Sequence, residues 1–313
     1  MSKSVLLSLL ADGEFHSGQH LAGALGVSRT AIWKQLNKLA ADGIEVESVK
    51  GRGYRIPGGI ELLQHDEIVA LLEPASAALL RELDIMDSID STNAEAMRRL
   101  EAGAGSGLVC TAEQQSAGRG RRGRHWVSPY ACNLYLSVVW EYSQGAAALE
   151  GLSLAAGVAV ARALRRCGVP PVQLKWPNDI LYDGAKLGGV LLEMAGDAAG
   201  ACQVVAGVGL NVAMPGKAST AIDQAWTDLE RVTEGAAPGR NALLATLLDE
   251  LLPLVADFEA GGFSAWRDQW LELDAFAGRS VVLTTGDHQM AGTARGVDCL
   301  LYTSDAADDT SEV

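Results

Sequence analysis

A short glycine- and arginine-rich segment is the feature that most restricts how this chain can fold. The seven residues from Gly118 to Arg124 hold four arginines and three glycines. Strand-like runs lie on both sides of it, "SGLVCTAEQQS" before and "HWVSPYACNLYLSVVW" after. Glycine lets the backbone take positive φ and approach a ligand closely, and arginine offers several planar donors to phosphate. The segment therefore predicts an anion-binding loop that connects two strands of one sheet.

The same glycines satisfy the G-x-G-x-x-G pattern of dinucleotide-binding sites. That fingerprint opens a helix directly after a strand, whereas here Pro129, aromatic residues and a second strand-like run follow. A dinucleotide site is therefore excluded. A nucleic-acid-binding patch and a solvated loop remain as alternatives, and repulsion among the guanidinium groups favours a mobile loop until an anion binds.

Residues 5–56 predict three short helices and a β-hairpin. Ser17 and Ser28 are placed to cap the second and third helices, and Gly26 can make the tight turn between them. The strand-like alternation in "IEVESVKGRGYRI" around Lys50 predicts the hairpin. A helix-turn-helix followed by a hairpin is the winged-helix arrangement, whose second helix enters the DNA major groove.

The charge distribution also points to nucleic acid at this end. The net charge is −14 over 313 residues, but residues 1–60 hold seven Lys/Arg and five Asp/Glu, or +2, which leaves −16 for the rest. The residues expected to contact DNA are Ser28, Arg29, Thr30, Trp33, Lys34, Asn37, Lys38, Lys50 and Arg52. A protein-interaction module with a solvated basic face is the alternative. One module reads few base pairs, so DNA binding implies a dimer.

The cysteine pattern and the hydropathy of the chain indicate its cellular compartment. The five cysteines are odd in number and form no C-x-x-C pair, which argues against a disulfide framework or a zinc site and for a reducing compartment. No apolar run approaches the roughly 18 to 20 residues that span a bilayer. The apolar core near the N-terminus, about six residues, is too short for a signal peptide. We therefore expect a cytoplasmic protein with no membrane partner.

Two further stretches combine polar residues with strands. "KWPND", from Lys175 to Asp179, places a cation, an indole and two polar groups beside a rigid turn former. After a turn at Asp183 and Gly184, Lys186 begins an apolar strand whose Gly188 and Gly189 would let a ligand lie flat against the backbone. Taken alone, such a lysine more often extends outward to solvent. "VVAGVGLNVAMP" adds another glycine-bearing strand.

In their order, "DSTN" (Asp90 to Asn93), "GRGRRGRHWVSP", "KWPNDI", "KLGGVLLE" and "GVGLNV" resemble the biotin protein ligases, over about residues 5–298. The winged helix narrows the resemblance to the bifunctional bacterial type, which also represses the biotin operon. The family implies an α+β fold: a winged helix-turn-helix, a mixed-sheet catalytic domain of the class II synthetase-like biotin/lipoate ligase type, and an SH3-like β-barrel. We expect a DNA-binding domain over 1–60, a catalytic domain over 61–270, an incomplete barrel over 271–298, and a divergent, disordered tail over 299–313.

The resemblance implies a two-step reaction. Biotin and Mg-ATP give biotinyl-5′-adenylate and pyrophosphate, and a lysine of the biotin carboxyl carrier domain of acetyl-CoA carboxylase then attacks the adenylate. The adenylate would also act as corepressor on operator DNA, with the protein as a homodimer. ATP, Mg²⁺ and biotin are thus implied, without a tightly bound prosthetic group and without a metal site in the chain. A repressor that senses ligand without catalysis and a lipoate or octanoate ligase are the alternatives.

Site residues carried over from the family fall into three groups. Catalytic roles are implied for Lys186, Arg121, Arg119, Lys175 and Asp179. Biotin contacts are implied for Ser91, Thr92, Asn93, Gln115, Arg119, Gly120, Arg121 and Lys186. Adenylate contacts are implied for Arg122, Arg124, Trp126, Asn178 and Asn211.

Several of these residues have simpler explanations that the sequence leaves open. Ser91 to Asn93 could cap the helix that follows them, and both roles can hold together. Trp126 either stacks near the adenine or is a buried anchor. Asp179 either orients the incoming lysine or a magnesium ion, or makes a hydrogen bond that stabilises a turn. Lys186 would follow charge from the biotin carboxylate to the α-phosphate.

The match to the family ends near Asp298. The family then has several more strands, with a glycine and an arginine near the adenine, whereas here the chain runs "CLLYTSDAADDTSEV". We expect a truncated barrel, or unrelated sequence after Asp298, because two or three strands cannot close and leave exposed edges. Weak ATP binding and a poorly packed C-terminal region would follow.

Overall fold

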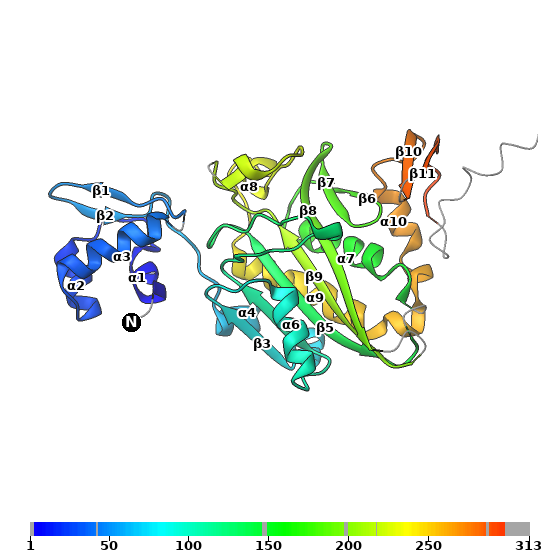
Figure 1. The fold of residues 1–313 in the computed structure, drawn as a ribbon, viewed down its shortest axis with the longest axis horizontal. Helices are drawn as coiled ribbons and strands as arrows, with labels where there is room; N and C mark the ends of the chain where they lie inside the picture. The colour runs from blue at the N-terminus through cyan, green and yellow to red at the C-terminus, as the bar shows by residue number, and fades with distance from the viewer. Residues whose placement is uncertain are drawn as a thin grey trace, which may run out of the picture.

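A computed structural model describes residues 3–41, 43–145, 149–196, 200–216, 218–285 and 288–297. A small N-terminal head, residues 3–55, lies at one end of a larger body built on a mixed sheet (Figure 1). The expected α+β class and the mixed central sheet are confirmed. No helix in the described ranges has the length and apolar character needed to cross a bilayer.

The head has the expected winged-helix elements. Ser17 caps α2 by accepting a hydrogen bond from His20 N at 3.0 Å, and Gly26 ends that helix with φ 63°. The Ser28 hydroxyl accepts from Ala31 N at 3.2 Å at the start of α3. These local bonds satisfy helix-end groups and fix the tight turn. The elements are α1 (Lys3–Leu10), α2 (Gly18–Leu25), α3 (Arg29–Ala41), β1 (Glu47–Val49) and β2 (Gly53–Arg55).

The body is organised around a sheet of seven described strands in the order β3-β4-β5-β9-β8-β7-β6. The β3–β4 pair is parallel and the other pairs are antiparallel. The strands are β3 (Glu82–Met86), β4 (Leu108–Ala112), β5 (Leu134–Tyr142), β6 (Gln173–Lys175), β7 (Asp179–Tyr182), β8 (Ala185–Gly196) and β9 (Cys202–Leu210).

Helices cover the two faces of this sheet unequally. On β5, Leu136 and Val138 belong to the large core with α7 and α9, whereas Val139, on the opposite face, packs with Ala96 and Leu100 of α6. The period of two along a strand explains why alternate residues reach different layers. The body helices are α4 (His65–Leu71), α5 (Pro74–Leu79), α6 (Thr92–Glu101), α7 (Leu152–Arg166), α8 (Leu229–Val232), α9 (Arg240–Gly261) and α10 (Arg267–Leu273).

The C-terminal region, where we expect an incomplete SH3-like barrel, forms only a small sheet in its described residues. β10 (Ser280–Thr285) and β11 (His288–Thr293) form a two-stranded antiparallel sheet, and no other described strand pairs with it. A barrel is therefore not confirmed. The expected tail, 299–313, and Asp298 lie outside the described residues.

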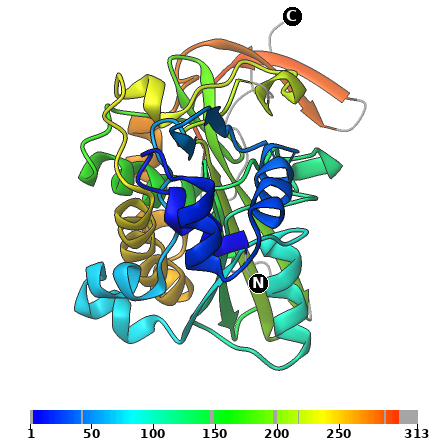
Figure 2. The same cartoon turned by 90° about the vertical axis from the view of Figure 1, so that its left-hand side faces the viewer.

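A buried polar network holds the segment that joins the head to the body. Glu113 Oε1 accepts from Leu63 N at 2.6 Å, and its Oε2 lies 2.8 Å from an Arg240 nitrogen. Glu61 Oε1 accepts from the Asn241 side chain at 2.9 Å. Since an unpaired buried charge is costly, these contacts favour one position of the segment after the head. Figure 2 views the molecule from the head side.

A second contact joins head and body directly. Tyr130 and Ala131, which precede β5, are buried in the same apolar cluster as Leu6 and Leu10 of α1. Lys3 Nζ lies 3.8 Å from the centre of the Tyr130 ring. The body therefore completes part of the core of the head.

Candidate functional site

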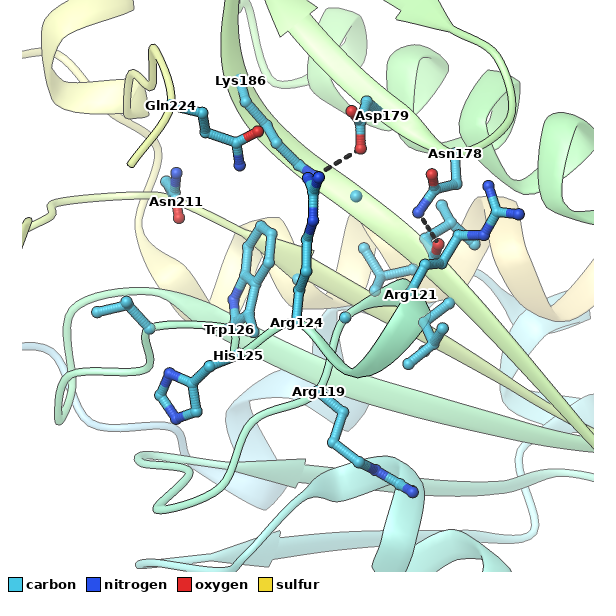
Figure 3. A pocket seen from close by; sticks show the side chains of 18 of the residues that line it. Arg119, Arg121, Arg124, His125, Trp126, Asn178, Asp179, Lys186, Asn211 and Gln224 are labelled. Atoms are coloured by element: carbon cyan, nitrogen blue, oxygen red, sulfur yellow. Dashed lines mark hydrogen bonds and ion pairs between the residues drawn. The ribbon is translucent and has the colours of Figure 1, made fainter. Parts of the chain in front are cut away.

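A cavity of about 970 Å³ opens on the body between the arginine segment, β8, β9 and the loop before α8. Pockets of this size hold small ligands. Figure 3 shows side chains from these separate segments around it. The expected catalytic, biotin-binding and adenylate-binding residues all line it: Ser91, Thr92, Asn93, Gln115, Arg119, Gly120, Arg121, Arg122, Arg124, Trp126, Lys175, Asn178, Asp179, Lys186 and Asn211.

One end of the cavity is neutral and polar. Gln115 Oε1 accepts from Thr92 N at 2.8 Å, and Gln115 Nε2 donates to the Ser128 hydroxyl at 3.0 Å. Ser91 occupies the N-cap position of α6, but its side chain makes no capping hydrogen bond. The Ser91 hydroxyl is therefore placed at the cavity without serving the helix. Buried donors and acceptors of this kind suit a neutral polar ligand group.

Asp90 anchors this end from outside. The Arg98 guanidinium donates to both Asp90 oxygens, at 2.8 and 2.9 Å, and Ser91 N donates to Asp90 Oδ1 at 2.8 Å. These hydrogen bonds, above all those from Arg98, lower the pKa of Asp90 to about 2. The carboxylate favours one conformation of the segment that leads into α6.

Two residues behind the cavity wall were missed by the sequence reasoning. The fully buried Ser137 hydroxyl of β5 donates to Asn93 Oδ1 at 2.6 Å and lies 2.8 Å from Thr92 Oγ1. Glu193 of β8 accepts from Asn93 Nδ2 at 2.8 Å. A polar residue inside each strongly apolar strand is the signal that could have identified them.

Two glycines of β9 make room for cavity side chains. A Cβ on Gly207 would stand 2.1 Å from Asn93 Oδ1, and a Cβ on Gly209 would stand 2.7 Å from the Trp126 indole. The indole therefore lies against the sheet, and its Nε1 is buried without a hydrogen-bond partner. This placement is compatible with both roles expected for Trp126.

The cationic side of the cavity centres on Lys186. Its Nζ lies 2.5 Å from Asp179 Oδ1 and 5.6 Å from the centre of the Trp126 ring. The side chains of Lys186 and Asp179 are 16% and 18% exposed, so this lysine does not extend outward to solvent. This ion pair with Lys186 was not among the roles expected for Asp179, which were to orient the incoming lysine or Mg²⁺, or to stabilise a turn. Figure 3 shows the two groups pointing toward each other.

The arginine segment connects β4 to β5, as expected for a loop between strands of one sheet. It turns through a 3₁₀ segment at Arg121–Gly123, where Arg122 has φ 56°, and Gly120 N donates to Arg124 O at 2.7 Å. The side chains of Arg121, Arg122 and Arg124 are exposed at the cavity mouth. Arg119 differs, because its guanidinium donates to Glu193 at 2.9 Å.

The remaining expected residues line the cavity while also holding its walls. Asn178 Nδ2 donates to Val190 O at 2.8 Å, and Asn211 Nδ2 donates to Thr227 O at 3.0 Å. One glycine expectation is wrong: Gly189 lines the cavity, but Gly188 is packed against Gly209 O and Leu210. Of these two glycines, only Gly189 is open to a ligand.

Metal-ligand chemistry is sparse around the cavity. Among the described residues, no group of three or more His, Cys, Asp or Glu side chains could hold a metal ion. Asp179 and Asp223 are the described carboxylates that line the cavity. Mg²⁺ commonly binds through nucleotide phosphates and one or two carboxylates, so these residues fit an ion that arrives with ATP.

A second candidate surface lies on the head. Ile32, Leu36 and Leu39 of α3 are buried, as expected, and Trp33 is 54% exposed. Arg52 of the hairpin lies over the Phe15 ring at 4.0 Å, which holds its guanidinium near the end of the wing. The residues expected to contact DNA are all exposed: Ser28, Arg29, Thr30, Trp33, Lys34, Asn37, Lys38, Lys50 and Arg52.

The segments that carry the cavity and the head both match known protein families. Residues 85–211 match the model of the biotin/lipoate A/B protein ligase family, and residues 3–55 match a helix-turn-helix (HTH) domain model. The chain is 43% identical to the bifunctional ligase/repressor BirA of Salmonella typhimurium, over 94% of this chain and 89% of that protein. It is 42% identical to BirA of Escherichia coli K12, over 94% and 88%.

A solved structure supports the same relationship. The biotin protein ligase of Aquifex aeolicus, in complex with biotin and ATP, superimposes with a TM-score of 0.58 at 26% identity. The match covers 70% of this chain and 89% of that protein.

Proposed function

Because this chain belongs to the family of bifunctional biotin ligase/repressors, we propose which of its side chains carry each activity. It is an ATP-dependent biotin protein ligase and a DNA-binding repressor. The observation that carries the assignment of residues is the single cavity in which a buried neutral polar end, Lys186 and the arginine segment meet.

In the first step, a biotin carboxylate oxygen bonds to the α-phosphorus of ATP, the bond from that phosphorus to the leaving oxygen breaks, and pyrophosphate leaves. Two anionic groups must approach, so cations have to offset their repulsion. Lys186, Lys175 and Arg121 line the cavity for this purpose. We propose that Lys186 exchanges Asp179 for the biotin carboxylate and the α-phosphate as charge moves between them.

We propose that biotin and the adenylate bind at different ends of the cavity. The ureido ring of biotin would bind at Ser91, Thr92, Asn93 and Gln115, with Arg119, Gly120 and Arg121 closing over it. Arg122, Arg124, Trp126, Asn178 and Asn211 would bind the adenylate. A closed arginine segment would also exclude water from the mixed anhydride.

In the second step, the amine of a lysine on the biotin carboxyl carrier domain of acetyl-CoA carboxylase bonds to the acyl carbon. The bond to the phosphate oxygen breaks, AMP leaves, and the amine loses a proton. We propose Asp179 as the carboxylate that orients this amine once Lys186 has moved away from it. Mg²⁺ would enter with the ATP phosphates.

The C-terminal sheet contributes to the nucleotide side of this proposal. Val282 and Leu283 of β10 line the cavity. We propose that β10 and β11 are the remaining part of an incomplete SH3-like barrel beside the adenylate, which would bind ATP weakly.

Repression would use the head as a dimer on operator DNA, with biotinyl-5′-adenylate as corepressor. One segment connects the two activities physically, since Trp126 lines the cavity and Tyr130, four residues later, packs in the core of the head. Closure of the arginine segment can therefore reach the head along a short stretch of chain. The free, described cysteines suit the cytoplasm proposed for this activity.

The test is pyrophosphate release on mixing the purified protein with biotin and Mg-ATP, followed by transfer of labelled biotin to a carrier-domain lysine. Lys186→Ala and Arg121→Ala are run beside the unmodified protein and should be strongly impaired. Pyrophosphate release that depends on lipoate instead of biotin would contradict the proposed substrate. Biotin binding without any pyrophosphate release would contradict catalysis.

A further inference from the structure

We propose that Glu193 is a positioning residue that sets both the polar end of the cavity and the location of Arg119. The inference rests on the proposed function, because it concerns the biotin-binding half of that site. Glu193 lies on β8 behind the cavity wall and does not line the cavity. It acts through the two residues that its carboxylate contacts.

One carboxylate oxygen gathers donors from two separate segments. Glu193 Oε2 accepts from Asn93 Nδ2 of α6 at 2.8 Å and from an Arg119 guanidinium nitrogen at 2.9 Å. The Glu193 side chain is 29% exposed and that of Arg119 is 42% exposed. An ion pair this open contributes little to stability. Its effect is to favour one location for each donor.

The first effect concerns the orientation of the Asn93 amide. A side-chain amide can be turned either way, but an ionised carboxylate only accepts hydrogen bonds. Glu193 and Leu191 O, 3.3 Å from Asn93 Nδ2, therefore require the NH₂ group to face β8. Asn93 Oδ1 then faces the Ser137 hydroxyl, 2.6 Å away.

Further hydrogen bonds connect Ser137 with Thr92, Gln115 and Ser128 at the polar end of the cavity. Ser137 lies 2.8 Å from Thr92 Oγ1, and Thr92 N donates to Gln115 Oε1, which leaves Gln115 Nε2 facing Ser128. The Glu193 carboxylate thus orients the Asn93 amide and, through it, the Ser137 hydroxyl, while the Thr92 backbone N–H orients Gln115. A cavity with its polar groups oriented in advance binds a neutral polar ligand without first rearranging them.

The second effect concerns the arginine segment. Figure 3 shows the Arg119 side chain directed away from Lys186 and Asp179. Its contact with Glu193 ties the beginning of the segment to β8, while Arg121, Arg122 and Arg124 stay exposed. Glu193 therefore limits how far the segment can move from the cavity.

Two variants separate these effects. Glu193→Ala removes both the acceptor and the charge, whereas Glu193→Gln keeps an oxygen for Asn93 Nδ2 and loses the ion pair with Arg119. Glu141→Ala is the matched control, because Glu141 is an exposed glutamate of β5 that accepts from Gln203 Nε2 at 2.8 Å and does not line the cavity. Thermal melting shows that each variant is folded.

We expect Glu193→Ala to raise the KM for biotin in pyrophosphate release by about tenfold, because about one hydrogen bond to a charged group is lost. The kcat should change by less than about twofold. Trypsin should cut the arginine segment several-fold faster in both Glu193 variants. Glu193→Gln should return the KM to within about threefold of the unmodified value while cleavage stays fast. Glu141→Ala should change neither measurement.

An unchanged KM for biotin and an unchanged cleavage rate in Glu193→Ala would overturn the inference. So would equal losses for both variants in kcat alone. If the unmodified protein binds no biotin, the proposed function fails, and the cleavage comparison, which needs no substrate, still decides the role of Glu193.

Discussion

Lys186 Nζ lies 2.5 Å from Asp179 Oδ1, with both side chains mostly buried. The strand pairing explains this contact, because Lys186 is opposite Leu181 on β7 and Asp179 begins that same strand. The ammonium group thus has a counter-charge before any substrate carboxylate arrives. Removing one member of such a pair leaves the other as an uncompensated charge.

Lys186→Ala should lower the rate of pyrophosphate release by about 10²- to 10³-fold, the usual loss when one preorganised charge is removed from a transition state. It should also lower the melting temperature, because Asp179 loses its partner. Adding Asp179→Ala should restore part of that stability, since the two changes are coupled. Arg165→Ala, which removes an exposed cation of α7, is the control. Additive stability losses would contradict the pairing.

Gly207→Ala should weaken biotin binding by at least about tenfold, because its Cβ would stand 2.1 Å from Asn93 Oδ1 and displace the amide from Ser137. Isothermal titration with biotin measures the change. At Gly216 a Cβ would meet nothing within 4 Å, so Gly216→Ala should bind biotin normally. Normal affinity in Gly207→Ala would show that the Asn93 amide is not needed at that place.

The contribution of Asp90 to stability should depend on pH. Its pKa is about 2 in the folded protein, mainly because of Arg98, against an ordinary value of 3.8. A carboxyl whose pKa is lowered by folding stabilises the folded protein fully at pH values above its pKa in the unfolded chain. This contribution is lost as the pH falls through its pKa in the folded protein. The melting-temperature difference between the unmodified protein and Asp90→Asn should therefore shrink from pH 4 to pH 2. Because Asp90 is partly exposed, the difference should be small and weaken in salt. A constant difference over this range would contradict the assignment.

Lys34→Ala should weaken operator binding and reduce the slope of log affinity against log salt concentration by about one, as expected for the loss of one phosphate contact. Pyrophosphate release should be unchanged, because Lys34 lies on the head and does not line the cavity. Filter binding across salt concentrations measures the slope. Arg165→Ala removes the same charge from the body and should leave DNA binding unaffected. An unchanged slope in Lys34→Ala would place the DNA on another surface.

Cys110 and Cys132 should react slowly with iodoacetamide at pH 8 in the folded protein. Burial raises the pKa of Cys110 to about 12 and that of Cys132 to about 11, so little thiolate is present. Mass spectrometry before and after denaturant measures the labelling. Labelling of the folded protein at the denatured rate would mean that β4 and the turn before β5 open readily.

Much of the site could be predicted because its parts are short and contiguous. Ser17, Gly26 and Ser28 predict the turn of the head because helix ends need local partners, and those bonds form. Residues of the arginine segment and "KWPND" do meet at one cavity, although their individual roles remain proposals. For the C-terminal region we expect an incomplete SH3-like barrel, and this barrel type is not confirmed because the two described strands form only a small sheet.

The sequence alone determined which segments become helices, strands and loops, and which of them carry the polar and cationic groups. The tertiary structure decided which of those groups touch. Glu193 reaches Asn93 and Arg119 because the fold brings α6 and the arginine segment against β8, and Asp179 reaches Lys186 because β7 pairs with β8. Such contacts depend on pairing between strands and helices far apart in the chain, and a single sequence records local preferences far more directly than it records register.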